Sequence, residues 1–311
     1  MIEARGLTKS YGPTVAVSEL SFTVRPGLVT GFLGPNGAGK TTTMRMILGL
    51  DRPSAGSVTI GGIPYADLRW PMRAVGALLD ARAVHGGRTA RSQLLSLAQT
   101  NGIGRRRVDE VLGIVGLAEV AGKRSKGFSL GMSQRLGIAA ALLGDPQILM
   151  FDEPVNGLDP EGIVWIRTLM RSLAAEGRTV LVSSHLMPEM EHTADHLIVI
   201  GRGQLIADCS VADFVARGPI PAVLVRTPQR EALELAVGAA GGIATEAGED
   251  LSVRGLTEEQ IAELAFANGI RVYHLASAKA SLEQAFMELT AGSVEYRAAT
   301  QPASSGTEAG Q

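Results

Sequence analysis

A glycine-rich stretch near the N-terminus holds the residues best suited to chemistry. The pattern G-x-x-x-x-G-K-[ST] is matched by Gly34, Pro35, Asn36, Gly37, Ala38, Gly39, Lys40 and Thr41. Glycines let backbone N–H groups point inward, and a helix beginning here adds partial positive charge where phosphate oxygens would lie. We expect Lys40 to bridge the β- and γ-phosphates of a nucleotide, and the Thr41 hydroxyl to complete part of an octahedral Mg²⁺ shell. With Thr42, these residues form the predicted phosphate-binding loop.

Two adjacent carboxylates follow a second apolar run. Asp152 and Glu153 come directly after residues 148–151, which read as a buried strand. Side chains alternate along a strand, so the two acids cannot share one role. We assign Asp152 to the metal, directly or through a bound water, and Glu153 to the attacking water as general base or polarising group. Taken alone, an Asp-Glu pair at a strand end is usually a solvated turn, and the upstream phosphate loop favours the catalytic interpretation.

The elements that must position these residues are strands and helices in alternation. Apolar runs at 29–33, 148–151 and 180–183 predict strands, and a helix opening at Pro160 separates the last two. Strand, helix and strand at this spacing indicate a parallel sheet. A further strand, a turn and a strand within 196–207 predict a hairpin at the end of this region.

A helical insertion interrupts the strand pattern between about residues 80 and 145. Its periodicity is clearest at Val108, Val111, Leu112 and Val115, which fall on one face of a helix. The predicted fold class is therefore α/β, a P-loop NTPase domain over residues 1–218 that carries this insertion.

A second, smaller unit is predicted over residues 219–292. Two prolines and a glycine at 218–221 interrupt any helix or ladder and mark the boundary. The patterns that follow read strand, helix, strand, strand, helix, strand, the order of a small α+β domain of the ferredoxin-like kind. A last helix runs from Ser281 to Thr290. Residues 293–311 have too little apolar content to build a core, and we expect them to be a disordered tail.

The composition of the chain argues against several partners and structural classes. The chain has 311 residues, 29 Lys and Arg against 31 Asp and Glu, a net charge of −2, and one cysteine, Cys209. Without a basic excess, nucleic acid is not an expected partner. One cysteine excludes an internal disulfide and a cysteine-based zinc cluster. Charged residues interrupt every apolar run well short of a bilayer-spanning length, and no secretory signal is evident, so we expect neither a membrane span nor export of this chain.

From these motifs in this order, residues 1–218 resemble the ATP-binding subunit of an ABC transporter. The resemblance implies that Tyr11, in Gly-Leu-Thr-Lys-Ser-Tyr-Gly, stacks on adenine. It also implies a signature segment at 128–135, of which Ser129, Gly131, Gln134 and Arg135 match. In the family the signature serine and backbone amides clasp the γ-phosphate bound by the other subunit. The departures from the usual signature are Leu130 and Met132, which add bulk and remove one polar contact.

Three further positions take their roles from the same resemblance. Asp159, in Asn-Gly-Leu-Asp, corresponds to the loop that touches the partner subunit near its catalytic acid. His185 corresponds to the histidine that senses the γ-phosphate. Asp80 stands where the family usually has glutamine; an aspartate there is a harder Mg²⁺ ligand, so metal contact is expected and glutamine-type hydrogen-bond donation is not.

The resemblance further implies how such a chain works. Because the signature acts across an interface, we expect two copies, or this chain and a paralogous ATPase subunit, to enclose two composite ATP sites, with Mg²⁺ as cofactor. Hydrolysis would then separate the halves. Separate transmembrane permease subunits would receive the work, which places the chain at the cytoplasmic face of the cell membrane. The late helix and extra domain look like those of bacterial drug and antibiotic exporters.

Two other interpretations remain open at this point. A soluble ABC-type ATPase acting in translation or DNA repair would share the motifs, although such proteins usually carry two ATPase domains or special insertions. A low-turnover ATP-binding regulator would account for the departures at Asp80, Leu130 and Met132.

Overall fold

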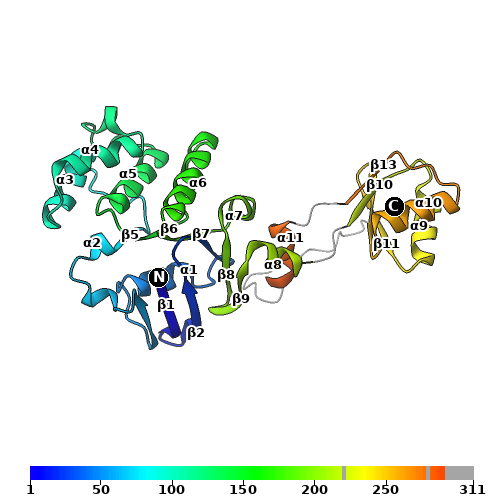
Figure 1. The fold of residues 1–311 in the computed structure, drawn as a ribbon, viewed down its shortest axis with the longest axis horizontal. Coiled ribbons are helices and arrows are strands. Elements are labelled where there is room, and N and C mark those ends of the chain that lie inside the picture. The colour runs from blue at the N-terminus through cyan, green and yellow to red at the C-terminus, as the bar shows by residue number, and fades with distance from the viewer. Residues whose placement is uncertain (219–221, 278–280, 291–311) are drawn as a thin grey trace, which may run out of the picture.

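A six-stranded sheet forms the centre of the larger part of the chain (Figure 1). The computed structural model describes residues 1–218, 222–277 and 281–290. The sheet has the order β5-β6-β7-β3-β8-β9, and all neighbours are parallel except β8 and β9. Its strands are β3 (Val29–Leu33), β5 (Val75–Leu78), β6 (Ile148–Asp152), β7 (Thr179–Ser184), β8 (His196–Gly201) and β9 (Gln204–Ser210). The predicted parallel sheet and closing hairpin are therefore confirmed.

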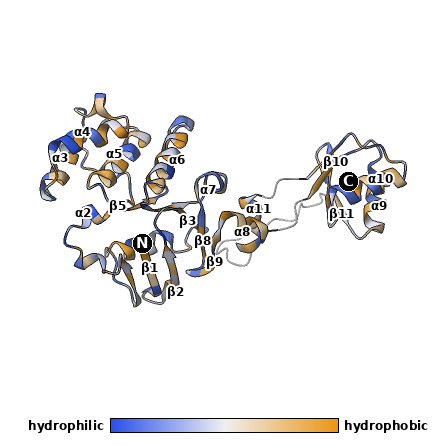
Figure 2. Ribbon diagram, viewed as in Figure 1, coloured by the Kyte–Doolittle hydropathy of each residue, from blue (hydrophilic) through white to orange (hydrophobic). Residues whose placement is uncertain are grey.

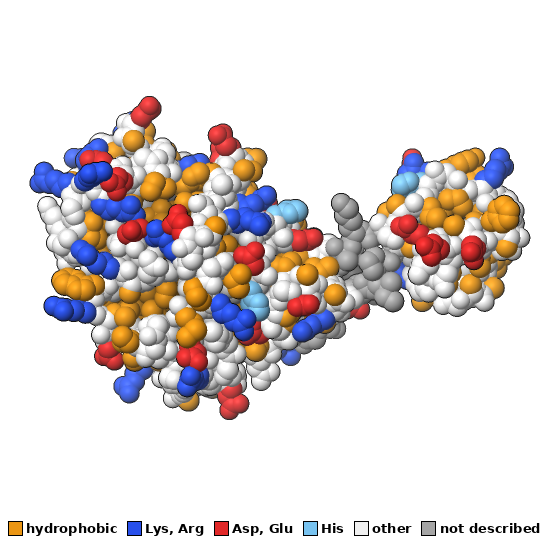
Figure 3. Space-filling view, viewed as in Figure 1, with side chains coloured by type: hydrophobic (Ala, Val, Ile, Leu, Met, Phe, Trp, Pro, Cys, Tyr) orange, Lys and Arg blue, Asp and Glu red, His pale blue; other side chains and the backbone are white. Residues whose placement is uncertain are grey.

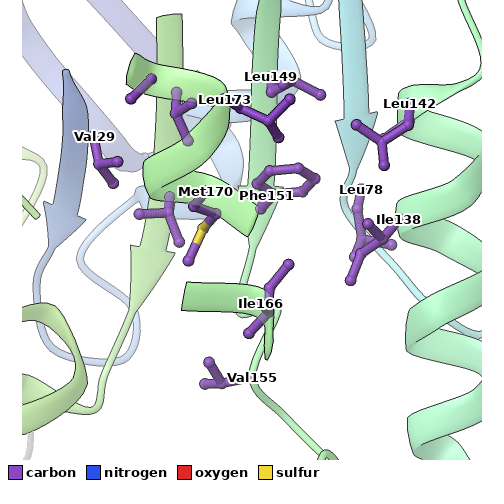
Figure 4. Close-up of a cluster of buried hydrophobic side chains, with 14 of the residues drawn as sticks. Val29, Leu78, Ile138, Leu142, Leu149, Phe151, Val155, Ile166, Met170 and Leu173 are labelled. Atoms are coloured by element: carbon purple, nitrogen blue, oxygen red, sulfur yellow. The ribbon is translucent and has the colours of Figure 1, made fainter. Parts of the chain in front are cut away.

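Apolar layers cover both faces of this sheet. On one face Leu149 and Phe151 of β6 pack with Met170 and Leu173 (Figure 4). Both hydrophobic and hydrophilic residues lie along α6 (Figure 2), and its buried residues Ile166, Met170 and Leu173 recur at helical spacing, as expected of a helix with one buried side. The other face packs against α1 and a three-stranded antiparallel sheet of order β2-β1-β4. The elements on this face are β1 (Ile2–Tyr11), β2 (Thr14–Val24), α1 (Lys40–Ile47) and β4 (Ala55–Ile60). The helices α6 (Pro160–Ala175), α7 (Met187–Thr193) and α8 (Val211–Ala216) contribute to the core of the first face.

The helical insertion extends from the end of β5. It comprises α3 (Ala90–Thr100), α4 (Arg105–Ile114) and α5 (Leu130–Leu142), with the short α2 (Pro71–Ala74) before β5. The predicted face of Val108, Val111, Leu112 and Val115 is fully buried. In the face drawn in Figure 3, acidic and basic side chains are interspersed over this part. No helix among the described residues is both long and apolar enough to cross a membrane.

The C-terminal unit has its own sheet and core. Its strands pair antiparallel in the order β11-β12-β10-β13, and two helices complete it. The elements are β10 (Val223–Arg226), α9 (Arg230–Ala239), β11 (Ile243–Ala247), β12 (Asp250–Arg254), α10 (Glu258–Ala267) and β13 (His274–Ser277). Side chains such as Val225, Leu251 and Ile261 form a separate buried cluster. The predicted βαββαβ order is confirmed.

The final helix, α11 (Leu282–Thr290), does not belong to that unit. The sequence placed it in a domain spanning 219–292, but α11 packs against α7 and α8, and Leu282, Ala285 and Phe286 join the core of the ATPase part. The Glu191 carboxylate accepts a hydrogen bond of 3.0 Å from the Leu282 backbone N–H. The chain therefore leaves the larger part after α8 and returns to it at α11. The predicted tail at 293–311 lies outside the described residues.

Because α11 is docked, its buried face should stabilise the larger part. Leu282 is fully buried, and Leu282→Ala should lower the free energy of unfolding by about 2–5 kcal/mol. Met287 lies on the same helix but is 66% exposed, so Met287→Ala should change the free energy of unfolding by at most about 0.5 kcal/mol. Both tryptophans, Trp70 and Trp165, lie in the larger part, so their fluorescence in urea follows its unfolding. Equal midpoints for the two variants would contradict docking of α11.

Candidate active site

The phosphate loop is a tight turn between β3 and α1. Gly37 and Gly39 adopt positive φ angles of 82° and 101°. A Cβ on Gly39 would come within 2.6 Å of the Ala16 carbonyl oxygen, and one on Gly34 within 2.5 Å of the Ile200 carbonyl oxygen. Only glycine fits at these two positions, because the loop is pressed against two neighbouring backbones.

Lys40, the first residue of α1, is folded over this loop. Its ammonium donates hydrogen bonds to the carbonyl oxygens of Gly34 at 2.6 Å and Pro35 at 3.2 Å. Burial lowers the pKa of Lys40, and the nearby carboxylates of Glu153 and Asp152 oppose that shift. The ammonium therefore stands in the loop beside two acids, where a phosphate oxygen could take the place of the carbonyl contacts.

A cluster of oxygen atoms lies beside Lys40. The Thr41 hydroxyl donates to one oxygen of the buried Asp152 carboxylate at 2.8 Å, and the Ser183 hydroxyl donates to the other. Hydroxyl and carboxylate oxygens are hard ligands of the kind Mg²⁺ binds. Within the described residues, no group of three or more His, Cys, Asp or Glu side chains could hold a metal by itself. A Mg²⁺ ion held by Thr41 and Asp152 would thus take its other ligands from phosphate and water.

Glu153 is held by contacts from three residues on two segments, the end of β7 and α5. His185 Nδ1 lies 2.7 Å from Glu153 Oε2, and the Glu153 N–H donates to the Ser183 hydroxyl at 3.0 Å. The Gln134 amide of α5 donates to the Glu153 carbonyl oxygen at 3.0 Å. Glu153 has a left-handed φ of 50°, a conformation that costs a non-glycine residue about 1–3 kcal/mol. The surrounding contacts compensate for this strain and aim the carboxylate at His185.

One cavity of about 340 Å³ brings most of these residues together. Its lining comprises Ala16, Asn36, Gly37, Ala38, Gly39, Lys40, Thr41, Thr42, Leu79, Asp152 and Glu153. Tyr11 lies at the exposed end of β1, where its hydroxyl donates to Asp51.

Asp80 is placed differently from the expectation. It is Leu79 that lines the cavity, whereas Asp80 is exposed and its carboxylate accepts a hydrogen bond of 2.8 Å from the Arg82 backbone N–H. The Asp80 carboxylate therefore does not join the oxygen atoms of Thr41 and Asp152 as predicted, because it follows the end of β5 at Leu78 and turns toward the Arg82 backbone.

The residues assigned to the signature and to the loop before α6 lie outside this cavity. Ser129 caps the N-terminus of α5 by accepting from the Met132 N–H at 3.2 Å, and Asp159 caps α6 by accepting from the Gly162 N–H at 3.0 Å. Gly131 packs so closely that a Cβ there would lie 2.8 Å from the Gly157 carbonyl oxygen. The two segments therefore pack on each other rather than on the phosphate loop of their own chain.

Sequence reasoning assigned no role to Ser183 or Gln134 at this site. Ser183 stands opposite Asp152 in the parallel register of β6 and β7, so the pairing of those strands was the signal that could have identified it. Gln134 was noted as a matching signature position, but its contact with Glu153 depends on how α5 packs.

Both parts of the chain are similar to known proteins. The family model of ABC transporters matches residues 17–156, and that of a domain of unknown function, DUF8746, matches residues 221–283. The bacitracin transport ATP-binding protein BcrA of Bacillus licheniformis is 44% identical over 211 residues, covering 67% of this chain and 69% of that protein. The uncharacterized ABC transporter ATP-binding protein YhcH of Bacillus subtilis (strain 168) is 35% identical over 294 residues, covering 93% and 96%. A solved dimeric ATP-binding cassette in a post-hydrolysis state, bound to ADP and Pi, gives a TM-score of 0.62 at 26% identity, covering 68% of this chain and 98% of that chain.

Proposed function

The chain belongs to the ABC transporter family of ATP-binding proteins and is an ATPase, and from this premise we propose that it drives a separate membrane permease which exports a drug, antibiotic or lipid-like compound. The observation that carries the site assignment is the meeting of Lys40, Thr41, Asp152 and Glu153 in one cavity. The similarity to the bacitracin transport protein supports the class of cargo. The same similarity supports a peripheral position at the cytoplasmic face of the membrane.

We assign the hydrolytic step to Glu153 and His185. The Glu153 carboxylate takes a proton from water while the water oxygen attacks the γ-phosphorus, and the bond from that phosphorus to the β–γ bridging oxygen breaks. ADP and phosphate leave, and the proton passes from Glu153 to solvent. His185, 2.7 Å from the carboxylate, holds Glu153 in position and would contact the γ-phosphate of a bound nucleotide. Mg²⁺, held by Thr41 and Asp152, would offset negative charge on the phosphates.

A second chain would complete the site. Ser129 and Gly131 lie outside the phosphate cavity of their own chain, as does Asp159, and this supports their predicted action on the nucleotide of a partner. The dimeric cassette among the similar structures supports the same arrangement. The γ-phosphate then joins the two halves, so its loss releases them.

A groove of about 520 Å³ beside Asp80 is the proposed contact with the permease. It lies between α1, the end of β5 and the helical insertion, and is mostly apolar, with Leu50, Leu97 and Leu136 among its residues. The Gln93 side-chain oxygen in this groove is buried and has no hydrogen-bond partner among the described residues. The apolar walls of the groove suit an apolar helix of the permease placed in it.

Purification of the tagged chain from membranes solubilised in detergent tests this proposal. We expect a protein with several apolar helices to co-purify and to raise the ATPase rate. Leu50 is 57% exposed in the groove, so Leu50→Asp should abolish co-purification but leave the ATPase of the free chain unchanged. Leu205→Asp on β9, outside the groove, is the control and should retain the permease. Ribosomes or DNA in the purified material would instead support the translation or repair alternative, and negligible ATPase with the permease would support a regulator.

A further inference from the structure

A network of contacts links Tyr11 to α1, the helix that begins at the phosphate loop. Tyr11 lies at the tip of the hairpin formed by β1 and β2, where its backbone pairs with Thr14, and 49% of its surface is exposed. An exposed ring at a hairpin tip is free to move unless other contacts hold it. Here the Tyr11 hydroxyl donates to Asp51 Oδ2 at 3.0 Å. A ring with that freedom removed can serve as a preorganised surface for a base.

Asp51 is in turn fixed to the helix that grips phosphate. Arg45 Nε donates to Asp51 Oδ2 at 2.8 Å, and Arg45 Nη2 donates to Oδ1 at 3.2 Å. The Asp51 side chain is 17% exposed and that of Arg45 is 44% exposed, so the contact lies at the surface, and its two-point geometry fixes the orientation of the carboxylate. Arg45 belongs to α1, the helix that begins with Lys40. Asp51 therefore joins the aromatic ring to the same rigid element that holds the phosphate-binding lysine.

The ring has one occupied face. The Lys9 ammonium lies 4.9 Å from the centre of the Tyr11 ring, and it donates to the Arg52 carbonyl oxygen at 2.7 Å. A cation held in this way is attracted electrostatically to the face of the ring and occupies that side of it. Because about half of the Tyr11 surface is exposed, the ring offers area on which a planar base could stack.

We propose that Asp51 is a positioning residue for nucleotide binding: paired with Arg45, it holds the Tyr11 ring at a fixed distance from the phosphate loop, so that the base and the phosphates of one nucleotide are bound together. This inference rests on the proposed ATP site. In this inference, the Asp51 contacts support the part of the binding affinity that comes from the base, and Lys40 supports the part that comes from the phosphates. Loss of the Asp51 contacts should therefore weaken recognition of the base alone.

The test compares ATP with inorganic tripolyphosphate, which has no base. In Asp51→Asn the charged contact with Arg45 is lost, and in Tyr11→Phe only the hydroxyl is removed. Each should raise the KM for ATP by about fivefold, within the range of one base–aromatic stack, with kcat within twofold of the parent. The inhibition constant of tripolyphosphate should not change. Asp51→Glu, which restores a carboxylate, should recover part of the affinity, and Asp67→Asn, an exposed acid in no such network, should match the parent.

A double variant shows whether the two residues act through one contact. Tyr11→Phe combined with Asp51→Asn should raise the KM no further than either change alone, because Tyr11→Phe removes the donor and Asp51→Asn removes the negative charge of the acceptor in the same contact. An unchanged KM in Asp51→Asn or in Tyr11→Phe would overturn the inference. Equal losses for ATP and tripolyphosphate would also overturn it, because they indicate general damage. If the parent bound neither compound, the proposed ATP site itself would be wrong.

Discussion

Glu153→Gln should lower the rate of ATP hydrolysis by about two to four orders of magnitude while leaving ATP binding intact. Glutamine has nearly the same shape, so its side-chain oxygen can keep the contact with His185 at 2.7 Å. An amide cannot accept the proton of the attacking water, so the chemical step is lost. Lys40 and Thr41, which would hold the phosphates and metal, are unchanged by the substitution.

The consequence of slow hydrolysis should be visible as a stable dimer. If the γ-phosphate joins two chains, ATP that persists keeps them joined, and Glu153→Gln should elute as a dimer in saturating Mg²⁺-ATP and as a monomer without it. Glu119→Gln, a change at an exposed acid of the helical insertion, is the matched control and should hydrolyse ATP like the parent. Hydrolysis by Glu153→Gln at the parental rate would refute the role of that acid. A monomer under saturating ATP would refute the two-chain site.

The local parts of the site could be predicted because local sequence determines them. A strand, a glycine loop and a helix follow one another over residues 29–47, so the phosphate loop needs no distant contact to be identified. Asp152 and Glu153 could be placed beside it because both segments end strands of one parallel sheet, whose carboxyl ends lie at a common edge. The βαββαβ order was likewise visible in short-range periodicity.

The parts that the sequence could not predict depend on packing between distant segments. Leu282 and Phe286 mark one apolar side of α11, but periodicity does not say which surface covers that side, and α7 and α8 prove to be that surface. The left-handed conformation of Glu153 has no sequence signal, because non-glycine residues rarely adopt it and contacts from Ser183 and Gln134 maintain it. The side-chain direction of Asp80 was similarly open, since the end of a strand can be predicted to within a few residues only.

Lys40→Ala should act on a different step, the binding of nucleotide. A hydrogen bond to a charged group contributes about 1.5–3 kcal/mol, so loss of the ammonium should weaken ATP affinity by about 10- to 150-fold. The loop should remain folded, because its tight turn depends on glycines at positions that alanine at Lys40 does not touch. The Gly34 and Pro35 carbonyl oxygens would lose a donor and accept water instead.

Titration calorimetry with ATP on the Lys40→Ala chain would measure this loss, with Lys123→Ala, an exposed lysine of the helical insertion, as the matched control. The contrast between the two variants is the sharper result, because Glu153→Gln should bind ATP and fail to hydrolyse it, whereas Lys40→Ala should fail to bind it. Any residual turnover of Lys40→Ala should therefore rise with ATP concentration. Affinity equal to the parent would mean that the ammonium remains on the loop carbonyls when nucleotide is present. The phosphates would then be held by backbone N–H groups and the metal alone, and the buried charge of Lys40 would serve only to stabilise the empty loop.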